Sequence, residues 1–223
     1  VSSLLGLSAV AVAWWLYGRD LPDVESLREV QLQVPLRVFT ADGKLIGIFG
    51  EKRRIPVSLE DLPDCLAQAF IASEDARFYE HPGVDYQGLT RAAWSLLTTG
   101  EKSIGGSTIT QQLARNFFLT TEKTFTRKIK EIFLALRIER ELEKNQILEL
   151  YMNKIFLGYR AYGVVAAAEV YYGKSPDQLS LAQCAMIAAL PKAPSRINPI
   201  TSPERAVERR DYVLGRMLEL GYV

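Results

Sequence analysis

Residues 124–142 read TFTRKIKEIFLALRIEREL. Apolar side chains in this stretch recur at Ile129, Ile132, Phe133 and Leu136. A spacing of i, i+3, i+4 and i+7 places such residues on one face of an α-helix, so the stretch predicts an amphipathic helix. Because most of the chain shows signals of this kind, we expect a mainly α fold.

Further helices are expected along the rest of the chain, from their apolar runs and their capping residues. The expected helices cover residues 61–79, residues 86–99, Ser107-Thr108 to Asn116, Asn145 to Phe156, Ser180 with Gln183 to Pro191, and Ser202-Pro203 to Gly221. The only clear strand signal is a pair of β-prone runs, 36–40 and 44–49, on either side of Asp42-Gly43. An Asp-Gly pair between two such runs predicts a short N-terminal β-hairpin.

The chain starts with an uncharged, apolar stretch, residues 1–17, that ends in the aromatic group Trp14, Trp15 and Tyr17. At 1.5 Å per residue it spans roughly 26 Å, close to a hydrocarbon core of about 30 Å, and the aromatic group is typical of the membrane interface. We therefore expect a transmembrane helix truncated at its start, since the first residue is Val1 and not Met. A signal-peptide segment or a buried core helix stays open as an alternative.

The rest of the chain divides into three expected parts. We expect a connector and the β-hairpin over 18–58, the main domain over 59–190, and a proline-rich wrap and helix over 191–223. A further domain after Val223 is left open.

Composition excludes several classes of protein. With 223 residues, 48% of them hydrophobic and 24% charged, the chain has a globular balance and not that of a disordered protein. The formal net charge is +1, so no basic field suggests a nucleic-acid partner. One histidine and two cysteines are too few for most zinc sites. Cys65 and Cys184 lie in apolar helical contexts, which favours two buried thiols, although a disulfide stays open.

Three polar segments suggest chemistry. Glu74 follows the apolar run of residues 70–72, where burial raises the pKa of a carboxyl group and suits it to proton transfer. The alternative is a solvated helix face. If residues 105–116 are helical, one face of that helix carries Thr108, Gln111, Gln112 and Arg115. These side chains form a hydrogen-bonding stripe suited to sugar hydroxyls and phosphate. The alternative there is a polar surface helix.

The third segment lies within the quoted stretch, where helical spacing places Glu131 between Arg127 and Lys128. Two cations beside one carboxylate suit a pyrophosphate. The alternative is a surface ion pair. If the cations bind a ligand, their removal is expected to lower turnover while barely changing the melting temperature.

Together these segments resemble the peptidoglycan glycosyltransferase family, the transglycosylase domain of class A penicillin-binding proteins. The matching motifs are Glu74-Asp75-x-x-Phe78-x-x-His81-x-Gly83, Gly106-Ser107-Thr108-x-Thr110-Gln111-Gln112-Leu113-x-Arg115-Asn116, Arg127-Lys128-x-x-Glu131, Ile147-Leu148-Glu149-x-Tyr151-x-Asn153, and Gly163 through Gly173-Lys174. They follow one another in order and at family-like spacing. Arg115 is a departure, because many members carry Lys there.

The resemblance implies a lysozyme-like, two-lobed, mainly α-helical fold that polymerises lipid II into β-1,4-linked glycan with inversion. It implies that Glu74 is the general base and that Glu131 assists at the pyrophosphate end, where it is also the candidate ligand for an optional Mg²⁺ or Mn²⁺ ion. No cofactor is expected to be required. The expected substrate-binding residues are Asp75, Phe78, His81, Arg91, Ser107, Thr108, Gln111, Gln112, Arg115, Asn116, Arg127 and Lys128. Among these, Asp75, Phe78 and His81 are expected to hold Glu74 in place.

The resemblance also implies where the protein acts and with what. The expected partners are lipid II, the growing lipid-linked glycan chain, the membrane and other cell-wall synthesis proteins. The expected location is the bacterial inner membrane, crossed once, with the catalytic domain on the periplasmic side. A lysozyme-like glycosidase and a non-catalytic wall-binding scaffold are the alternatives.

Overall fold

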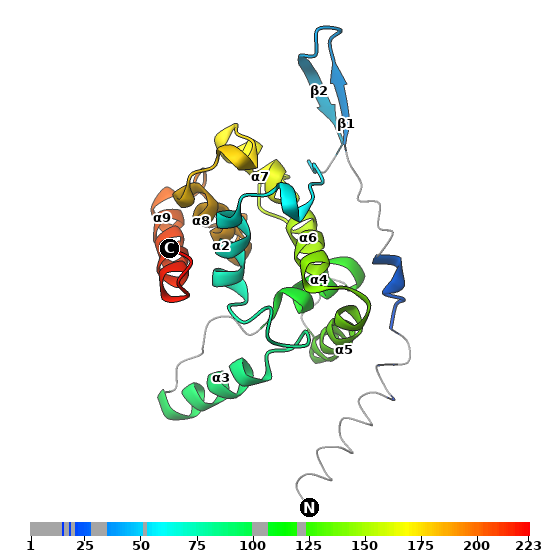
Figure 1. Ribbon diagram of the computed structural model, residues 1–223, viewed down its shortest axis with the longest axis vertical. Helices are drawn as coiled ribbons and strands as arrows, with labels where there is room; N and C mark the ends of the chain where they lie inside the picture. Colours follow the sequence, from blue (N-terminus) through cyan, green and yellow to red (C-terminus); the bar gives the residue numbers. More distant parts are fainter. Residues whose placement is uncertain are drawn as a thin grey trace, which may run out of the picture. The chain divides into compact units, whose positions relative to one another are not determined.

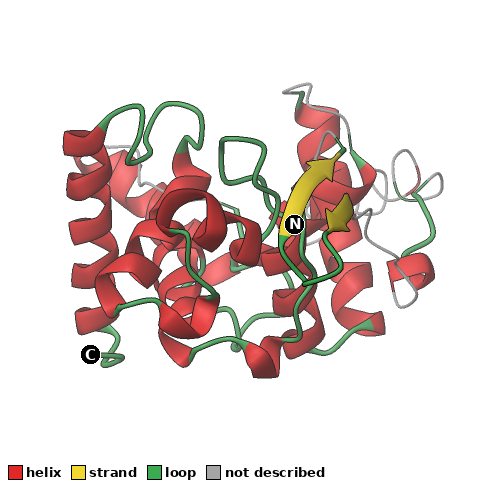
Figure 2. Cartoon of the chain, turned by 90° about the horizontal axis from the view of Figure 1, so that it is seen from above, coloured by secondary structure: helices red, strands yellow, loops and turns green. Residues whose placement is uncertain are grey.

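The computed structural model describes Trp15, Gly18 and residues 21–27, 35–50, 53–99, 107–119 and 124–223. The described chain is predominantly helical and carries one small β-hairpin (Figure 2). It divides into two compact units. The first unit consists of Val1–Val30 with Arg77–Ile147, and the second consists of Gln31–Ala76 with Leu148–Val223.

The first unit is built on α3 (Tyr86–Thr99), α4 (Ile109–Phe118) and α5 (Phe125–Glu141). Helices α4 and α5 pack side by side (Figure 1). Fully buried side chains on these two helices include Ile109, Leu113, Leu134 and Ile138. Helix α6 (Lys144–Lys154) begins in this unit and continues into the second.

The buried face of α5 differs from the stripe that the sequence predicts. The buried residues are Glu131, Phe133, Leu134, Ala135 and Ile138, whereas Ile129, Ile132 and Leu136 are only half-buried. Positions 131, 134, 135 and 138 also follow i, i+3, i+4 and i+7, so the contact with α4 selects this second face. A carboxylate, Glu131, therefore lies on the buried side of the helix.

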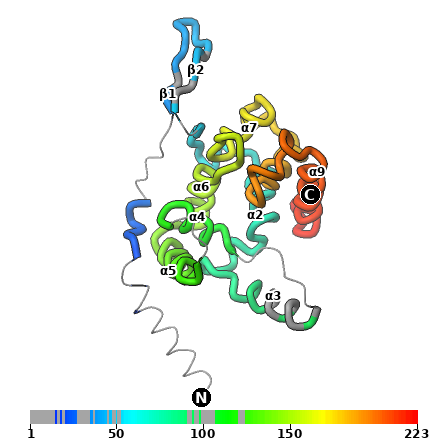
Figure 3. Tube along the Cα trace, turned by 180° about the vertical axis from the view of Figure 1, so that it is seen from behind, coloured from blue at the N-terminus to red at the C-terminus, as the bar shows by residue number. Residues whose placement is uncertain are grey.

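The second unit contains α2 (Asp64–Glu74), α7 (Val164–Tyr172), α8 (Leu181–Ala189) and α9 (Pro203–Glu219). Helices α2, α8 and α9 pack against one another, and Figure 3 shows the same three together from behind. Their core is apolar and includes the fully buried Leu66, Phe70, Ile187, Val213 and Met217. This packing fixes α2, the helix whose last residue is Glu74.

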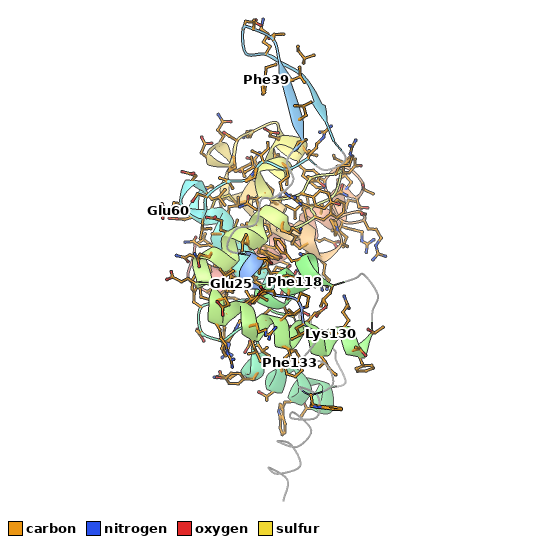
Figure 4. All side chains as sticks on the ribbon, turned by 90° about the vertical axis from the view of Figure 1, so that its right-hand side faces the viewer. Glu25, Phe39, Glu60, Phe118, Lys130 and Phe133 are labelled. Carbon is orange, nitrogen blue, oxygen red and sulfur yellow. A yellow bond between two sulfur atoms is a disulfide. The ribbon has the colours of Figure 1, made fainter. Side chains whose placement is uncertain are left out.

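The predicted hairpin is confirmed. Strands β1 (Leu36–Phe39) and β2 (Leu45–Phe49) pair antiparallel, with a register shift between Val38 and Phe39. Gly43 takes a φ of +81°, which only glycine adopts without strain, and its N–H donates to the Thr40 carbonyl. Phe39 projects from the hairpin in Figure 4.

Most predicted helices are confirmed within one or two residues, because their caps act locally. Thr108 caps α4 and Thr124 caps α5 through side-chain oxygens that accept from backbone N–H groups. Ser180 and Gln183 form the expected capping box of α8.

Two expectations about the backbone are wrong, and one helix has no counterpart among the predicted ones. The helix predicted over 61–79 ends at Glu74, because Asp75 leaves the helical region at φ −158° and ψ 73°. Helix α7 was not predicted, since its run of apolar residues shows no period. The proline-rich segment 191–203 is expected to be an extended wrap or linker, but residues 193–201 form successive turns. The buried Asn198 amide there is bonded to three backbone groups.

The cysteines form a disulfide between α2 and α8, with Cα atoms 6.1 Å apart, and are not the two thiols that the sequence favoured. The cysteines are separated by 119 positions in the sequence, which gives no hint that the two helices lie side by side.

Apart from Trp15, the predicted transmembrane stretch 1–17 lies outside the described residues. None of the helices in the part of the chain that the structure describes combines the length and the apolar character needed to cross a membrane.

Candidate active site

The centre of the first unit's polar site is the Glu131 carboxylate. Its side chain is only 1% exposed, yet it lies between two cations of its own helix. Arg127 Nη1 is 3.3 Å from Oε1, and Lys128 Nζ is 3.2 Å from Oε2. The predicted placement of Glu131 between the two cations is confirmed, and the burial of its carboxylate contradicts the alternative of a solvated surface pair.

Two polar atoms at this centre lack a hydrogen-bond partner among the described residues. They are Glu131 Oε1 and Arg127 Nε, and both are buried. The contact between Arg127 and Glu131 is therefore an ion pair without an aligned hydrogen bond to Oε1. A buried polar atom without a partner is costly, so this acceptor and this donor mark a place where a ligand can complete the network.

Lys128 connects α5 to the start of α4. Besides Glu131, its ammonium donates to Ser107 Oγ at 2.7 Å and to Gln111 Oε1 at 3.0 Å, which uses all three of its protons. Its side chain is 37% exposed, so solvent also reaches it. The predicted residues Ser107, Gln111 and Lys128 thus form one cluster with Arg127 and Glu131, and we call these five residues the cation cluster.

Thr108 has a local structural role. Its hydroxyl accepts from the Gln111 N–H at 3.2 Å and donates to the Gly83 carbonyl at 2.6 Å. The single hydroxyl proton is therefore already engaged, and the side chain acts as the cap of α4. Its expected contact with the substrate stays a prediction.

For the remaining predicted substrate-binding residues of α3 and α4, the structure gives their burial or their position on the helix. Gln112 is buried on α4, and Arg115 and Asn116 are half-buried further along the same helix. The side chain of Arg91 lies outside the described ones. For these four residues, substrate contact stays a prediction.

In the second unit, Glu74 is the last residue of α2 and is half-buried. Its neighbour Asp75 is buried and caps the helix, with its N–H donating to the Ile71 carbonyl at 2.9 Å. Ser73 Oγ donates to the Ala188 carbonyl of α8 at 3.1 Å. The end of α2 is therefore held rigidly, which suits a group that must meet a substrate in one geometry.

The loop that follows Glu74 in the sequence is also tightly held. Phe78 is fully buried, and the Lys144 ammonium lies 4.6 Å from its ring centroid. His81 is buried, and its Nδ1 accepts from the Gly83 N–H at 3.1 Å. The structure thus gives Phe78 and His81 places inside the first unit, and their predicted role in holding Glu74 stays a prediction.

An ion pair closes this loop. The Arg77 guanidinium donates to the Asp85 carboxylate, which also accepts from the Gly88 N–H at 2.8 Å. Burial alone would raise the pKa of Asp85, but the Gly88 N–H and the Arg77 charge outweigh it, so the net pKa is lowered.

Sequence reasoning missed a second polar group in the first unit, formed by Thr110, Glu139 and Lys144. Glu139 Oε1 accepts from Thr110 Oγ1 at 2.5 Å and from Lys144 Nζ at 2.8 Å. No local signal separates these residues from ordinary surface positions, because their partners lie on three different helices.

The motif that contains Glu149 and Asn153 has a structural explanation. Glu149 Oε2 accepts from the Leu59 N–H at 2.8 Å, and the Asn153 amide bonds both the N–H and the carbonyl of Val57. These contacts hold the segment that leads into α2. Glu149 and Asn153 therefore position a helix and are not candidates for catalysis.

The described residues do not fit a dedicated metal site. They contain no group of three or more His, Cys, Asp or Glu side chains that could hold an ion. Glu131, the one predicted ligand, lies against two cations, which disfavour a further positive charge at its oxygens.

A mainly helical domain with a buried carboxylate between two cations suits an enzyme that handles an anionic substrate. Comparison with known proteins identifies the class: residues 42–218 match the family model described as Transglycosylase. The chain belongs to the transglycosylase family.

Two similar relatives and one similar solved structure carry the same name. Penicillin-binding protein 1A of Escherichia coli strain K12 is 58% identical over 220 residues, which cover 99% of this chain and 26% of that protein. Its namesake in Vibrio cholerae is 57% identical over 220 residues, covering 99% of this chain and 27% of that protein. A 2.6 Å crystal structure of penicillin-binding protein 1A from Haemophilus influenzae is 39% identical, covers 87% of this chain and 19% of that one, and gives a TM-score of 0.48. The chain spans about a quarter of the length of the curated relatives it matches.

Proposed function

We propose that this chain is a peptidoglycan glycosyltransferase that polymerises lipid II into β-1,4-linked glycan and releases undecaprenyl pyrophosphate. The observation that carries the proposal is the buried Glu131 between Arg127 and Lys128, in a chain whose residues 42–218 match the transglycosylase family. A lysozyme-like glycosidase has no leaving pyrophosphate, so a pair of cations beside the carboxylate gives no support to that alternative.

The reaction is a displacement at one carbon atom. The 4-hydroxyl oxygen of the acceptor GlcNAc attacks the anomeric carbon of the donor MurNAc, and the bond from that carbon to the pyrophosphate oxygen breaks. In the proposal, Glu74 accepts the proton of the attacking hydroxyl. The leaving pyrophosphate keeps the electron pair of the broken bond, so it needs cations more than it needs a proton.

The cation cluster supplies this stabilisation. Arg127 offers a buried Nε–H without a hydrogen-bond partner among the described residues, and the partly exposed ammonium of Lys128 offers its positive charge. Both are preorganised around Glu131, so little reorganisation is required as negative charge grows on the leaving group. Glu131 keeps the two cations in place when no substrate is bound.

We propose that the reaction proceeds without a bound metal ion, because the candidate ligand Glu131 already lies against two cations. The proposal further includes a lysozyme-like, two-lobed organisation, a single membrane anchor over residues 1–17, and a catalytic domain on the periplasmic side of the bacterial inner membrane. Lipid II, the growing lipid-linked glycan and the membrane are its proposed partners, together with other cell-wall synthesis proteins.

The test is to incubate the protein with lipid II in detergent and in vesicles, with and without EDTA. Glycan polymer whose formation is blocked by moenomycin is the expected product, at the same rate with EDTA. Fragments released from purified cell wall, in place of polymer from lipid II, would instead identify a glycosidase. Binding to cell wall without either product would identify a scaffold.

A further inference from the structure

The ion pair between Lys144 and Glu139 lies largely out of solvent. The Lys144 side chain is 20% exposed and that of Glu139 is 8% exposed, with 2.8 Å between Nζ and Oε1. A pair of this kind recovers its cost of desolvation only when further polar partners are present. Here Lys144 also donates to the His81 carbonyl at 2.6 Å, and Glu139 accepts from Thr110.

These partners connect the pair to the first turn of α4 by two routes. One route is direct, because Thr110 lies in that turn. The other runs through the loop: Lys144 holds the His81 carbonyl, the His81 ring accepts from the Gly83 N–H, and the Gly83 carbonyl accepts from the Thr108 hydroxyl.

The loop and helix α5 are in close contact at Gly83. A Cβ at this position would lie 2.9 Å from the Ala135 carbonyl oxygen and 2.9 Å from Glu139 Cγ. The backbone of the loop therefore rests directly on the helix that carries Glu139, which leaves little room for the loop to shift.

The first turn of α4 is in turn the start of the cation cluster. Thr108 caps the helix by accepting from the Gln111 N–H, and both Ser107 and Gln111 accept from the Lys128 ammonium. A displacement of this turn would move two of the three hydrogen-bond acceptors that set the position of Lys128.

We infer that Lys144 and Glu139 are positioning residues for the cation cluster: together they set the first turn of α4 and, through it, the Lys128 ammonium. The inference rests on the proposed function, since it supposes that this ammonium meets the leaving pyrophosphate. Neither residue is assigned contact with the substrate.

The test uses Lys144→Met in the full chain, with Lys144→Arg as the conservative variant. Lys44→Met is the matched control, because it removes an exposed ion pair, Lys44 with Asp42, from the hairpin. For each protein we would measure the melting temperature, kcat and KM on lipid II per folded molecule, and the ¹⁵N spectrum of His81. His81 is the only histidine in the chain, so its two ring nitrogens report on the loop without overlap.

We expect Lys144→Met to lower kcat per folded molecule by about 10- to 100-fold, as small misplacements of catalytic groups do. The His81 ¹⁵N signals should shift in the same variant, because its carbonyl loses the Lys144 donor. Lys144→Arg should recover most of the kcat, and Lys44→Met should match the wild type in every measurement.

If Lys144→Met lowers the melting temperature but keeps the wild-type kcat per folded molecule, the ion pair is merely structural and the inference is overturned. If Lys144→Met does not fold, Glu139→Gln decides, since Gln keeps an acceptor for Thr110 but removes the charge opposite Lys144. For that variant a kcat loss of about 3- to 10-fold is expected, and unchanged kcat would overturn the inference. A wild-type protein that makes no polymer, yet shows the expected His81 shift on substitution, would overturn the proposed function instead.

Discussion

Replacement of Lys128 by Ala separates the roles that this residue has in binding and in folding. The sequence alone led us to expect lower turnover with little change in melting temperature. The structure changes the second half of that expectation, because the carboxylate that Lys128 contacts is only 1% exposed. Its removal leaves the buried Oε2 of Glu131 without its 3.2 Å hydrogen bond.

The magnitude follows from that contact. A hydrogen bond to a charged group contributes about 1.5–3 kcal/mol to stability. The Lys128 side chain is 37% exposed and Arg127 still faces Glu131, so we expect a loss near the lower end, about 1–2 kcal/mol. For a protein of this size, that loss lowers the melting temperature by about 2–8 °C. Turnover should fall further, by about 10²–10³-fold, as for the loss of one donor that stabilises developing charge.

The assay compares thermal melting and initial rates on lipid II for Lys128→Ala and for Lys130→Ala. Lys130 lies on the same helix, where Figure 4 labels it, and it makes no ion pair or side-chain hydrogen bond with any residue that the structure describes. The control should match the wild type in both measurements. Turnover of Lys128→Ala within threefold of the control would refute the role in pyrophosphate binding, and an unchanged melting temperature would refute the argument from burial.

Three further substitutions test other parts of the structure. Glu74→Gln should lower the rate of polymerisation by about 10²–10⁴-fold with an unchanged circular dichroism spectrum, and retention of a tenth of the wild-type rate would contradict the general-base assignment. Gly83→Ala should destabilise the protein by about 2 kcal/mol or more, because φ at this residue is +92° and the new Cβ would lie 2.9 Å from the Ala135 carbonyl oxygen. Chemical denaturation measures this loss, and a loss below about 0.5 kcal/mol would contradict the argument. Asp85→Asn should lower the free energy of unfolding by its full amount at pH 7, and the loss relative to the wild type should become progressively smaller as the pH falls below about 4. The folded pKa of Asp85 is lowered, so the stability it contributes with Arg77 is present above the unfolded value and is lost as the pH falls through the folded one. Urea unfolding at pH 7 and pH 3 measures this, and an equal loss at both values would count against the lowered pKa.

The sequence by itself determined the helices whose signals are local. Thr108, Thr124 and the pair Ser180 and Gln183 cap helices through contacts within four residues, so their pattern is legible without the fold. The hairpin around Gly43 is local in the same sense. The neighbourhood of Arg127, Lys128 and Glu131 was also predictable, because one turn of helix brings them together.

The tertiary structure alone decided what depends on distant partners. The helix predicted through residue 79 ends at Glu74, and the fully buried Phe78 lies in the loop beyond it, although no breaking residue marks that end. The disulfide and the hydrogen bond from Thr110 to Glu139 join segments that only packing brings into contact. Glu131 is the clearest case, since two faces of α5 carry the same helical spacing and the contact with α4 selects the one that buries a carboxylate. A sequence records the period of a helix, but which face is buried depends on the helix that packs against it.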